Sequence, residues 1–283
     1  MTKSQRAILQ TLTYSDLFDF PLTKEELWRF LKSDQIISHD SFEESLLTLD
    51  TIASDKGFYF LKNRHSLVQS RYEKEKNSQK KIANSKNVIT ALSLIPSILF
   101  IGISGSLAMN NANNDDDVDL FLITKQNTVW TTRIMALGVL EMFGMRRKKT
   151  TRDPTNTVCI NMLIDEQNIS FLPDNHDVYI AHEIAQLTPV FDRNNTYQQF
   201  LHANAWITGF MPNVKIPETL QKTTKKKSKI SVVNTFVKYI QLLKINTTRT
   251  TEIVSDTILA FHPSDNRTKT LIRYKKIREK YKL

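Results

Sequence analysis

The stretch that decides the fold reads Ile98-Leu99-Phe100-Ile101-Gly102-Ile103-Ser104-Gly105-Ser106 and, after ten more residues, continues as Asp117-Val118-Asp119-Leu120-Phe121-Leu122-Ile123. Each part holds a short apolar run bounded by small or polar residues, which predicts buried strands over 98–103 and 118–123. Two of the six glycines of the chain, Gly102 and Gly105, fall in the first part. Glycine permits close approach of the backbone to another group, so we expect a turn whose N–H groups can face an anion.

Asp117 and Asp119 are the candidate chemical groups of this stretch. Side chains alternate along a strand, so residues two apart share one face, while Val118 and Leu120 anchor the other face in the core. Two adjacent carboxylates repel each other unless they share divalent cations. An anion-binding turn beside such a pair is suited to phosphoryl or nucleotidyl transfer. The alternative is an acidic surface turn, but an exposed loop would not continue into an apolar strand.

A long helix precedes these two strands, and the middle of the chain then alternates strand and helix. We expect one long helix over residues 66–95, another over residues 129–143, and a third strand over residues 158–164. The periodicity is helical again from residue 177 onward.

The first 65 residues read as a small separate unit of three helices followed by a short strand. Thr23 is expected to cap the second helix, with Glu26 at capping-box spacing. This order resembles a winged helix-turn-helix. The third helix, from about Asp40 to Ile52, carries four acidic residues and neither Lys nor Arg. Because DNA binding depends on neutralising phosphates, a scaffold or protein-contact role is favoured over DNA binding.

These segments predict an α/β plus α fold in which a small mixed-sheet core is flanked on both sides. The expected divisions are a winged-helix-like unit over 1–65, a connecting helix over 66–95, the core over 96–176, and a basic helical C-terminal domain over 177–283.

The charge of the chain is concentrated near its end. Residues 215–283 carry 17 basic and 5 acidic side chains, whereas residues 1–214 carry 22 and 24. The terminal segment is either a solvated basic helical tail or a contact surface for a polyanion. Its run Lys222–Lys229 reads as a linker.

A membrane span and a secreted location are both disfavoured. Residues 87–114 contain no charged side chain, but Pro96 and several polar residues interrupt them, and the densest apolar part is too short to span a bilayer. The first ten residues lack the apolar segment of a secretory signal. The single cysteine excludes an intramolecular disulfide framework and fits a cytoplasmic location.

Gly105-Ser106, followed at this distance by Asp117-x-Asp119 in an apolar strand, resembles the nucleotidyltransferase superfamily named after DNA polymerase beta. The resemblance covers about residues 85–165. Similar flanking stretches occur in bacterial members that carry an N-terminal winged-helix unit. In this chain they read Tyr14 to Leu22, Cys159-Ile160-Asn161, Ala181-His182-Glu183 and Phe261-His262-Pro263.

The resemblance implies a role for each matching residue. The Gly105 backbone and Ser106 would bind the terminal phosphates of a nucleoside triphosphate such as ATP, and Asp117 and Asp119 would hold two Mg²⁺ or Mn²⁺ ions. The superfamily usually places a third carboxylate on a later strand. Here Asn161 stands at the expected position, and Asp165 at the end of that strand is a possible substitute.

For the remaining candidate site residues, a purely structural role is an alternative to a role in the site. Arg133 either reaches a nucleotide phosphate or lies on the surface. The basic loop Arg146–Lys149 with Arg152 either attracts a triphosphate or is a solvated tip. We expect His182 to make structural hydrogen bonds, and Cys159 to be a buried thiol and not a nucleophile.

Two functions therefore remain open. The first is a Mg²⁺-dependent nucleotidyltransferase that moves a nucleoside monophosphate from a triphosphate to an unidentified hydroxyl acceptor, with Asp117, Asp119 and Asn161 as catalytic residues. The second is a catalytically weakened nucleotide-sensing or regulatory binding module. Asn161 is the sequence feature that separates them, because it supplies no charge and cannot act as a base.

Overall fold

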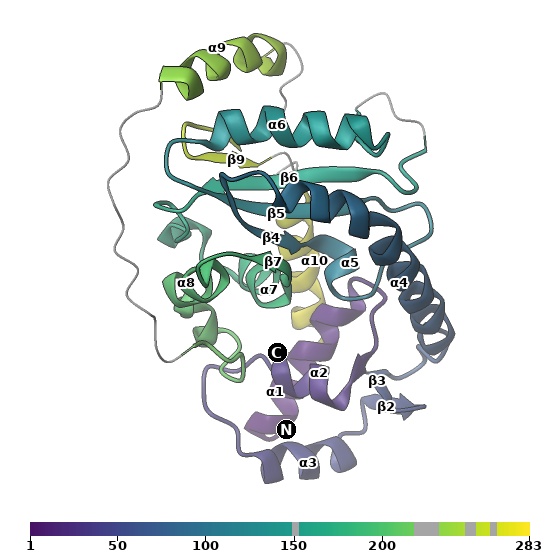
Figure 1. The fold of residues 1–283 in the computed structure, drawn as a ribbon. Coiled ribbons are helices and arrows are strands. Elements are labelled where there is room, and N and C mark those ends of the chain that lie inside the picture. The colour runs from purple at the N-terminus through teal and green to yellow at the C-terminus, as the bar shows by residue number, and fades with distance from the viewer. Residues whose placement is uncertain (149–152, 218–231, 247–252, 261–264) are drawn as a thin grey trace.

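The protein is a mixed α/β fold built on one six-stranded sheet (Figure 1), and the computed structural model describes residues 1–148, 153–217, 232–246, 253–260 and 265–283. The strand order is β7-β4-β5-β6-β9-β8, and only the β5–β6 pair is parallel. The strands are β4 (Ile98–Ile103), β5 (Val118–Thr124), β6 (Val158–Asp165), β7 (Thr188–Asp192), β8 (Ile253–Val254) and β9 (Ile258–Ala260).

The predicted strands over 98–103, 118–123 and 158–164 are confirmed as the centre of the sheet. Every residue of β4 is buried, because the strand has partners on both edges and helices over both faces. Gly102 is needed for packing there, since a Cβ atom on it would lie 2.9 Å from the Leu187 side chain. A buried strand of this kind reads as a continuous apolar run.

Helices cover both faces of the sheet, and Figure 1 shows α6 above the strands and α7 and α8 below them. Val118, Leu120 and Leu122 pack in one core with α4 and α6, whereas Phe121 and Ile123 pack in a second core with α7 and α8. These helices are α4 (Ser66–Ser93), α6 (Val129–Met142), α7 (Val178–Gln186) and α8 (Thr196–Ala203); α5 (Gly105–Ala108), α9 (Val232–Asn246) and α10 (Asp265–Tyr281) complete the larger part. The long helix expected over 66–95 is therefore confirmed.

Residues 1–65 form a smaller three-stranded sheet with three helices. Its strands follow the order β1-β3-β2. The predicted cap is confirmed, because the Thr23 hydroxyl accepts from Glu26 N at 3.1 Å and Glu26 Oε2 accepts from Thr23 N at 2.9 Å. The elements are α1 (Lys3–Asp16), β1 (Leu22–Thr23), α2 (Lys24–Arg29), α3 (His39–Thr48), β2 (Ile52–Asp55) and β3 (Phe58–Leu61).

The helical character expected of residues 177–283 is found only in part, because the described residues of this range also form β7, β8 and β9. β7 pairs with β4, and β9 pairs with β6, so the main sheet continues across the expected boundary at residue 177. β7 contains Pro189 and lies at the sheet edge, where a missing N–H is tolerated. β9 has only three residues. Segments this short do not produce a readable alternation of apolar and polar residues.

The uncharged stretch 87–114 is divided among the end of α4, the whole of β4, α5 and the loop after it. Among the described residues no helix has both the length and the apolar content that crossing a bilayer requires.

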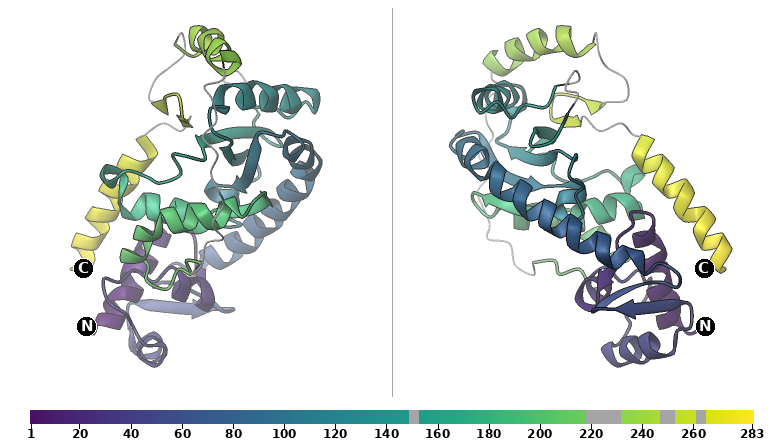
Figure 2. Two further views of the ribbon diagram at one scale, coloured as in Figure 1. Left: turned by 60° about the vertical axis from the view of Figure 1, so that its left-hand side comes forward. Right: turned by 90° about the vertical axis from the view of Figure 1, so that its right-hand side faces the viewer.

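The N-terminal unit packs directly on the larger part of the protein. Lys32 and His182 are each 5% exposed and contact one another through Nζ and Nε2. Tyr14 stacks on the His182 ring with 4.3 Å between ring centroids. The phenol of Tyr274 on α10 donates to Gln10 O on α1 at 3.2 Å. Figure 2 shows α10 beside the N-terminal helices, so the two ends of the chain lie together.

The buried Lys32–His182 pair should make stability depend on pH. Burial lowers the pKa of Lys32, and burial followed by the Lys32 charge lowers the pKa of His182. The unfolded chain therefore binds protons that the folded chain does not, so the free energy of unfolding rises with pH up to each unfolded pKa.

We expect Lys32→Met to raise the melting temperature at pH 6 by about 2–4 °C, the shift that roughly 1 kcal/mol gives in a chain of this size. The gain should persist at pH 9 and disappear only as the pH nears the unfolded lysine pKa of about 10.4. Thermal melts at pH 6, 9 and 10.5 test this, with the exposed Lys62→Met as control. A gain that does not change with pH would contradict this assignment.

Candidate functional site

A tight turn follows β4 and lies against the carboxylate of Asp119. Ser104 N donates to Asp119 O at 2.9 Å, which ties the end of β4 to β5. Gly105 has φ +66°, and a Cβ atom on it would lie 3.1 Å from Asp119 Oδ2. Position 105 therefore favours glycine for two reasons, its left-handed backbone and its contact with a carboxylate.

The loop between this turn and Asp117 is held by α4. Lys81, only 4% exposed, donates through Nζ to Asn114 O at 2.8 Å and to Asp116 O at 2.6 Å. The Ser78 hydroxyl accepts from Ala112 N at 3.1 Å. The long helix thus fixes the path of the loop that delivers Asp117 to its position.

Ser106 and Asp116 complete the turn. The Ser106 hydroxyl donates to Asp116 Oδ2 at 3.0 Å, and the same oxygen accepts from Asn113 N at 2.8 Å. Ser106 is exposed, so its hydroxyl remains accessible from solvent.

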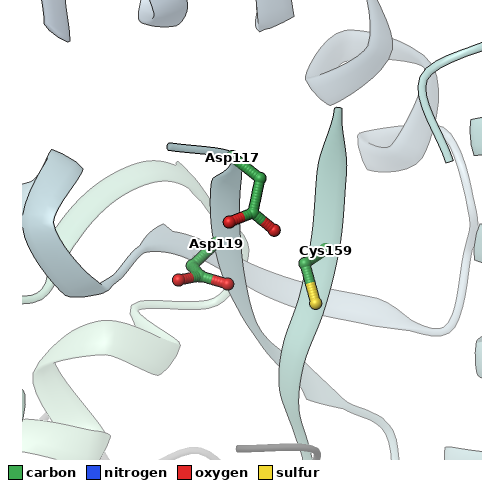
Figure 3. A group of neighbouring side chains, drawn as sticks. All are labelled: Asp117, Asp119 and Cys159. Carbon is green, nitrogen blue, oxygen red and sulfur yellow. The ribbon is translucent and has the colours of Figure 1, made fainter. Parts of the chain in front are cut away.

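Asp117, Asp119 and Cys159 form one cluster (Figure 3). One possible ligand atom from each residue lies within 4.8 Å of the others. Asp119 pairs directly with Cys159 in the parallel β5–β6 ladder, which brings the thiol to the carboxylates. Sequence reasoning found the two aspartates but missed Cys159 as a neighbour, because the register between two distant strands is not written in either strand.

Asn161, the residue expected at the third-ligand position, lies at an irregularity in the ladder. The β5–β6 register shifts between Leu120 and Phe121, whose partners are Ile160 and Met162. The Asn161 side chain is buried, and Nδ2 donates to Ser104 Oγ at 3.2 Å. Asn161 therefore contacts the residue before Gly105, while Cys159 is the residue opposite Asp119.

An arginine from the loop after α6 pairs with the carboxylate cluster. Arg147 Nη1 makes an ion pair with Asp117 Oδ2. Burial and the nearby charge of Asp119 raise the pKa of Asp117, and Arg147 opposes this rise. Burial, with Asp119 and Asp117 adding to it, raises the pKa of the Cys159 thiol, so the thiol is protonated at neutral pH in the absence of a bound cation.

Two other predicted candidates are held elsewhere. Arg133 donates from Nη1 to Gln241 Oε1 on α9 at 2.6 Å, so the arginine paired with the carboxylates is Arg147 and not Arg133. Asp165 lies at the opposite end of β6 and accepts from Asn127 N at 2.7 Å. Its carboxylate therefore holds the loop after β5. It lies far from the cluster, because its strand partner Thr124 is at one end of the seven-residue β5 and Val118 is at the other. Lys149, Arg152 and His262 lie outside the described residues.

A pocket of about 250 Å³ adjoins the turn and Asp119. One wall is the turn itself, a second comes from α7, and a third comes from α1 and the segment after it in the N-terminal unit. His182, which makes the structural contacts expected of it, lies in the α7 wall. The lining includes Tyr14, Phe18, Phe20, Phe30, Gly105, Ser106, Asp119, Tyr179, His182, Glu183 and Asn266.

The donor set fits a divalent cation. Carboxylate oxygens suit Mg²⁺ and Mn²⁺, whereas a thiol is a softer donor that suits Zn²⁺ better. Asp117 and Asp119 together therefore fit the metals expected from the sequence, and Cys159 in place of a third oxygen weakens the preference for Mg²⁺.

Comparison with known proteins returns no matching family, no matching curated protein and no matching solved structure.

We expect Asp117→Asn to stabilise the metal-free protein at neutral pH. Because its folded pKa is raised, ionised Asp117 costs stability as the pH rises through that pKa, and the cost is absent below the unfolded value of about 3.9. The variant should melt about 2–4 °C above the wild type at pH 7, and the difference should shrink towards pH 4. Asp115→Asn, an exposed residue of the same loop, should leave the melting temperature unchanged in EDTA. An equal difference at both pH values would contradict the carboxylate repulsion.

Arg147→Ala should strengthen cation binding, because Arg147 competes for an oxygen of Asp117. An ion pair that is partly exposed contributes up to about 1 kcal/mol, so the gain in Mn²⁺ affinity should be about two- to fivefold. Calorimetric titration with MnCl₂ measures this, with Lys148→Ala as the control because Lys148 pairs with Glu141 instead. A loss of affinity in Arg147→Ala would show that Arg147 supports the site and does not compete for it.

Proposed function

We propose that the protein is a divalent-cation-dependent nucleotidyltransferase of the DNA polymerase beta-like type. The reaction is transfer of a nucleoside monophosphate from a nucleoside triphosphate to a hydroxyl acceptor. The N-terminal order of helix, strand, two helices and two strands further supports a winged-helix-like unit attached to a nucleotidyltransferase core.

The observation that carries the proposal is the contact between the turn and the carboxylate. A Cβ atom at Gly105 would lie 3.1 Å from Asp119 Oδ2, so phosphates bound at the turn would be adjacent to a cation held by Asp117 and Asp119. Nucleotidyl transfer requires this adjacency, because charge develops on the phosphate oxygens as the bond to the leaving group breaks.

The residues have separate roles in the proposed reaction. The Gly105 backbone and the Ser106 hydroxyl bind the terminal phosphates. Asp117 and Asp119 would hold the divalent cation, which would supply a lower pKa at the acceptor hydroxyl and positive charge to offset that of the phosphates. The acceptor oxygen forms a bond to the α-phosphorus, the α–β bridging bond breaks, and pyrophosphate leaves. In this proposal a carboxylate oxygen of the Asp117–Asp119 pair accepts the hydroxyl proton.

The adjoining pocket limits what the acceptor can be. Ligand pockets usually measure about 300–1,000 Å³, and this one is smaller, at about 250 Å³. Its aromatic walls, which include Tyr14 and Phe18, suit a flat or slender group. A small molecule or a single extended chain end fits better than a folded macromolecule.

A second function, nucleotide sensing without turnover, is favoured by two observations. Cys159 stands opposite Asp119 where a third carboxylate would help activate the acceptor, and its thiol is protonated. Arg147 neutralises part of the charge of Asp117. Both features reduce the negative charge available for holding two cations.

Turnover is tested by incubating the full chain with α-³²P-labelled nucleoside triphosphates, Mn²⁺ and a cell extract, and following pyrophosphate release and label transfer. Asp119→Asn should abolish both signals, whereas Asp115→Asn should retain them. Equal rates in the two variants would remove Asp119 from the mechanism.

Cys159→Asp separates the two functions. In a weakened enzyme, a third carboxylate should raise the transfer rate about ten- to a hundredfold, because a positioned base acts on the chemical step. Cys159→Ser should not raise it, and Asn161→Asp should raise it less, since Asn161 lies at the ladder irregularity. In a sensor, triphosphate binds with Mn²⁺ but neither the wild type nor Cys159→Asp releases pyrophosphate.

A further inference from the structure

A second and larger cavity, of about 830 Å³, lies between the two ends of the chain. α1 and α10 form two of its walls, and the segment after α2 and the start of α7 form the others. It falls within the range of about 300–1,000 Å³ that small-molecule sites occupy, near the upper limit. None of the residues that line it takes part in the proposed reaction.

Cationic side chains dominate the lining of this cavity. They are Lys3 and Arg6 from α1 and Lys275 and Arg278 from α10. Lys32 also lines the cavity, but burial lowers its pKa, so it is not counted among these cations. Within the described parts of the chain, none of the four makes an ion pair with a carboxylate. Arg278 Nε is buried and finds no hydrogen-bond partner there.

The acidic residues of the lining do not balance these charges. Asp177 is committed to other partners, because it caps α7 and pairs with Arg267 at 2.6 Å. Asp34 also lines the cavity, but it is exposed to solvent. Several cations facing one concave space repel each other, and a bound anion removes this cost.

The cavity is held in shape by bonds between the chain ends. Arg6 Nη2 donates to Lys282 O at 3.1 Å, and Tyr274 donates to Gln10 O at 3.2 Å. Arg273 Nη2 donates to Leu17 O at 3.4 Å. Preformed walls reduce the entropy that ligand binding costs.

Buried side chains separate this cavity from the pocket beside Asp119. Lys32 lines the larger cavity and His182 lines the smaller pocket, and these two residues are in contact. Tyr274 and Tyr14 make a second such pair, with 5.1 Å between ring centroids. The two spaces therefore have separate linings.

We propose that the cavity between α1 and α10 is a second binding site, distinct from the Asp117–Asp119 site, for a small ligand that carries a chain of phosphate groups. Cations on two facing helices suit an anion that spans the space between them, which orthophosphate is too small to do. Phe210 and Tyr274 line the same cavity and offer aromatic surface to a nucleobase. The shared chemistry is the polyphosphate chain, whether inorganic or attached to a nucleoside.

The test is calorimetric titration of the full chain with inorganic tripolyphosphate in EDTA, where the Asp117–Asp119 site holds no cation. Parallel arms use orthophosphate, ATP, and a 20-nucleotide RNA with and without tripolyphosphate as competitor. Lys3→Glu/Lys275→Glu alters the cavity. Lys62→Glu/Lys276→Glu is the matched control, because it changes the net charge equally and Lys276 neighbours Lys275 without lining the cavity.

We expect tripolyphosphate to bind the wild type at least tenfold more tightly than orthophosphate. The cavity variant should lose at least tenfold in affinity and the control less than twofold, with melting temperatures confirming that both fold. If ATP and tripolyphosphate bind with equal affinity, the phosphate chain is the recognised group. If ATP binds more tightly, the ligand is a nucleotide. Both outcomes support the site. Asp117→Asn should bind tripolyphosphate in EDTA as the wild type does, which keeps this result separate from that for nucleotidyl transfer.

Three outcomes would overturn the proposal. They are an absence of tripolyphosphate binding, an equal loss in the two double variants, and RNA binding that tripolyphosphate does not displace.

Discussion

The register of β4 against β5 is the constraint on which the candidate site depends. Ile103 pairs with Leu120, and this pairing places Ser104 N on Asp119 O and the Gly105 backbone against the Asp119 carboxylate. A slip of one residue would turn Asp119 into the apolar core with α4 and α6 and would expose Leu120. The burial of Val118 and Leu120, which anchors the strand, therefore also determines the direction in which the carboxylates point. The same register is needed to bury the apolar side chains and to position the candidate carboxylates.

Local signals predicted much of the fold. The apolar run 98–103 coincides with β4, the long helical pattern coincides with α4, and the Thr23–Glu26 spacing gives the expected cap. These features depend on residues that are close in sequence. The candidate carboxylates were likewise visible, because their spacing is the period of a strand.

The features that could not be predicted all depend on residues far apart in sequence. β7 and β9 join the sheet only because β4 and β6 offer free edges, and their own sequences are too short to show it. Cys159 faces Asp119 through a parallel register, and Arg147 reaches Asp117 from a loop that was read as a solvated tip or an attractor of triphosphate. The N-terminal unit lines the pocket through α1, although its sequence reads as a separate module. The charge pattern identified the basic C-terminal segment. It did not show that Lys275 and Arg278 of this segment line one cavity with Lys3 and Arg6, which lie at the other end of the chain.

The pocket beside Asp119 draws its lining from residue 11 to residue 266. Contacts over such separations form late in folding, because the loops between them must close before any stabilising contact is gained. By contrast, β4 and β5 follow one another in sequence, and only the loop between them must close for these two strands to pair. A fragment truncated before α10 can therefore retain the strands that carry the carboxylates and still lack part of the wall of the pocket. Nicked or incompletely folded chains would then keep the strands that carry Asp117 and Asp119 without the enclosed pocket beside them.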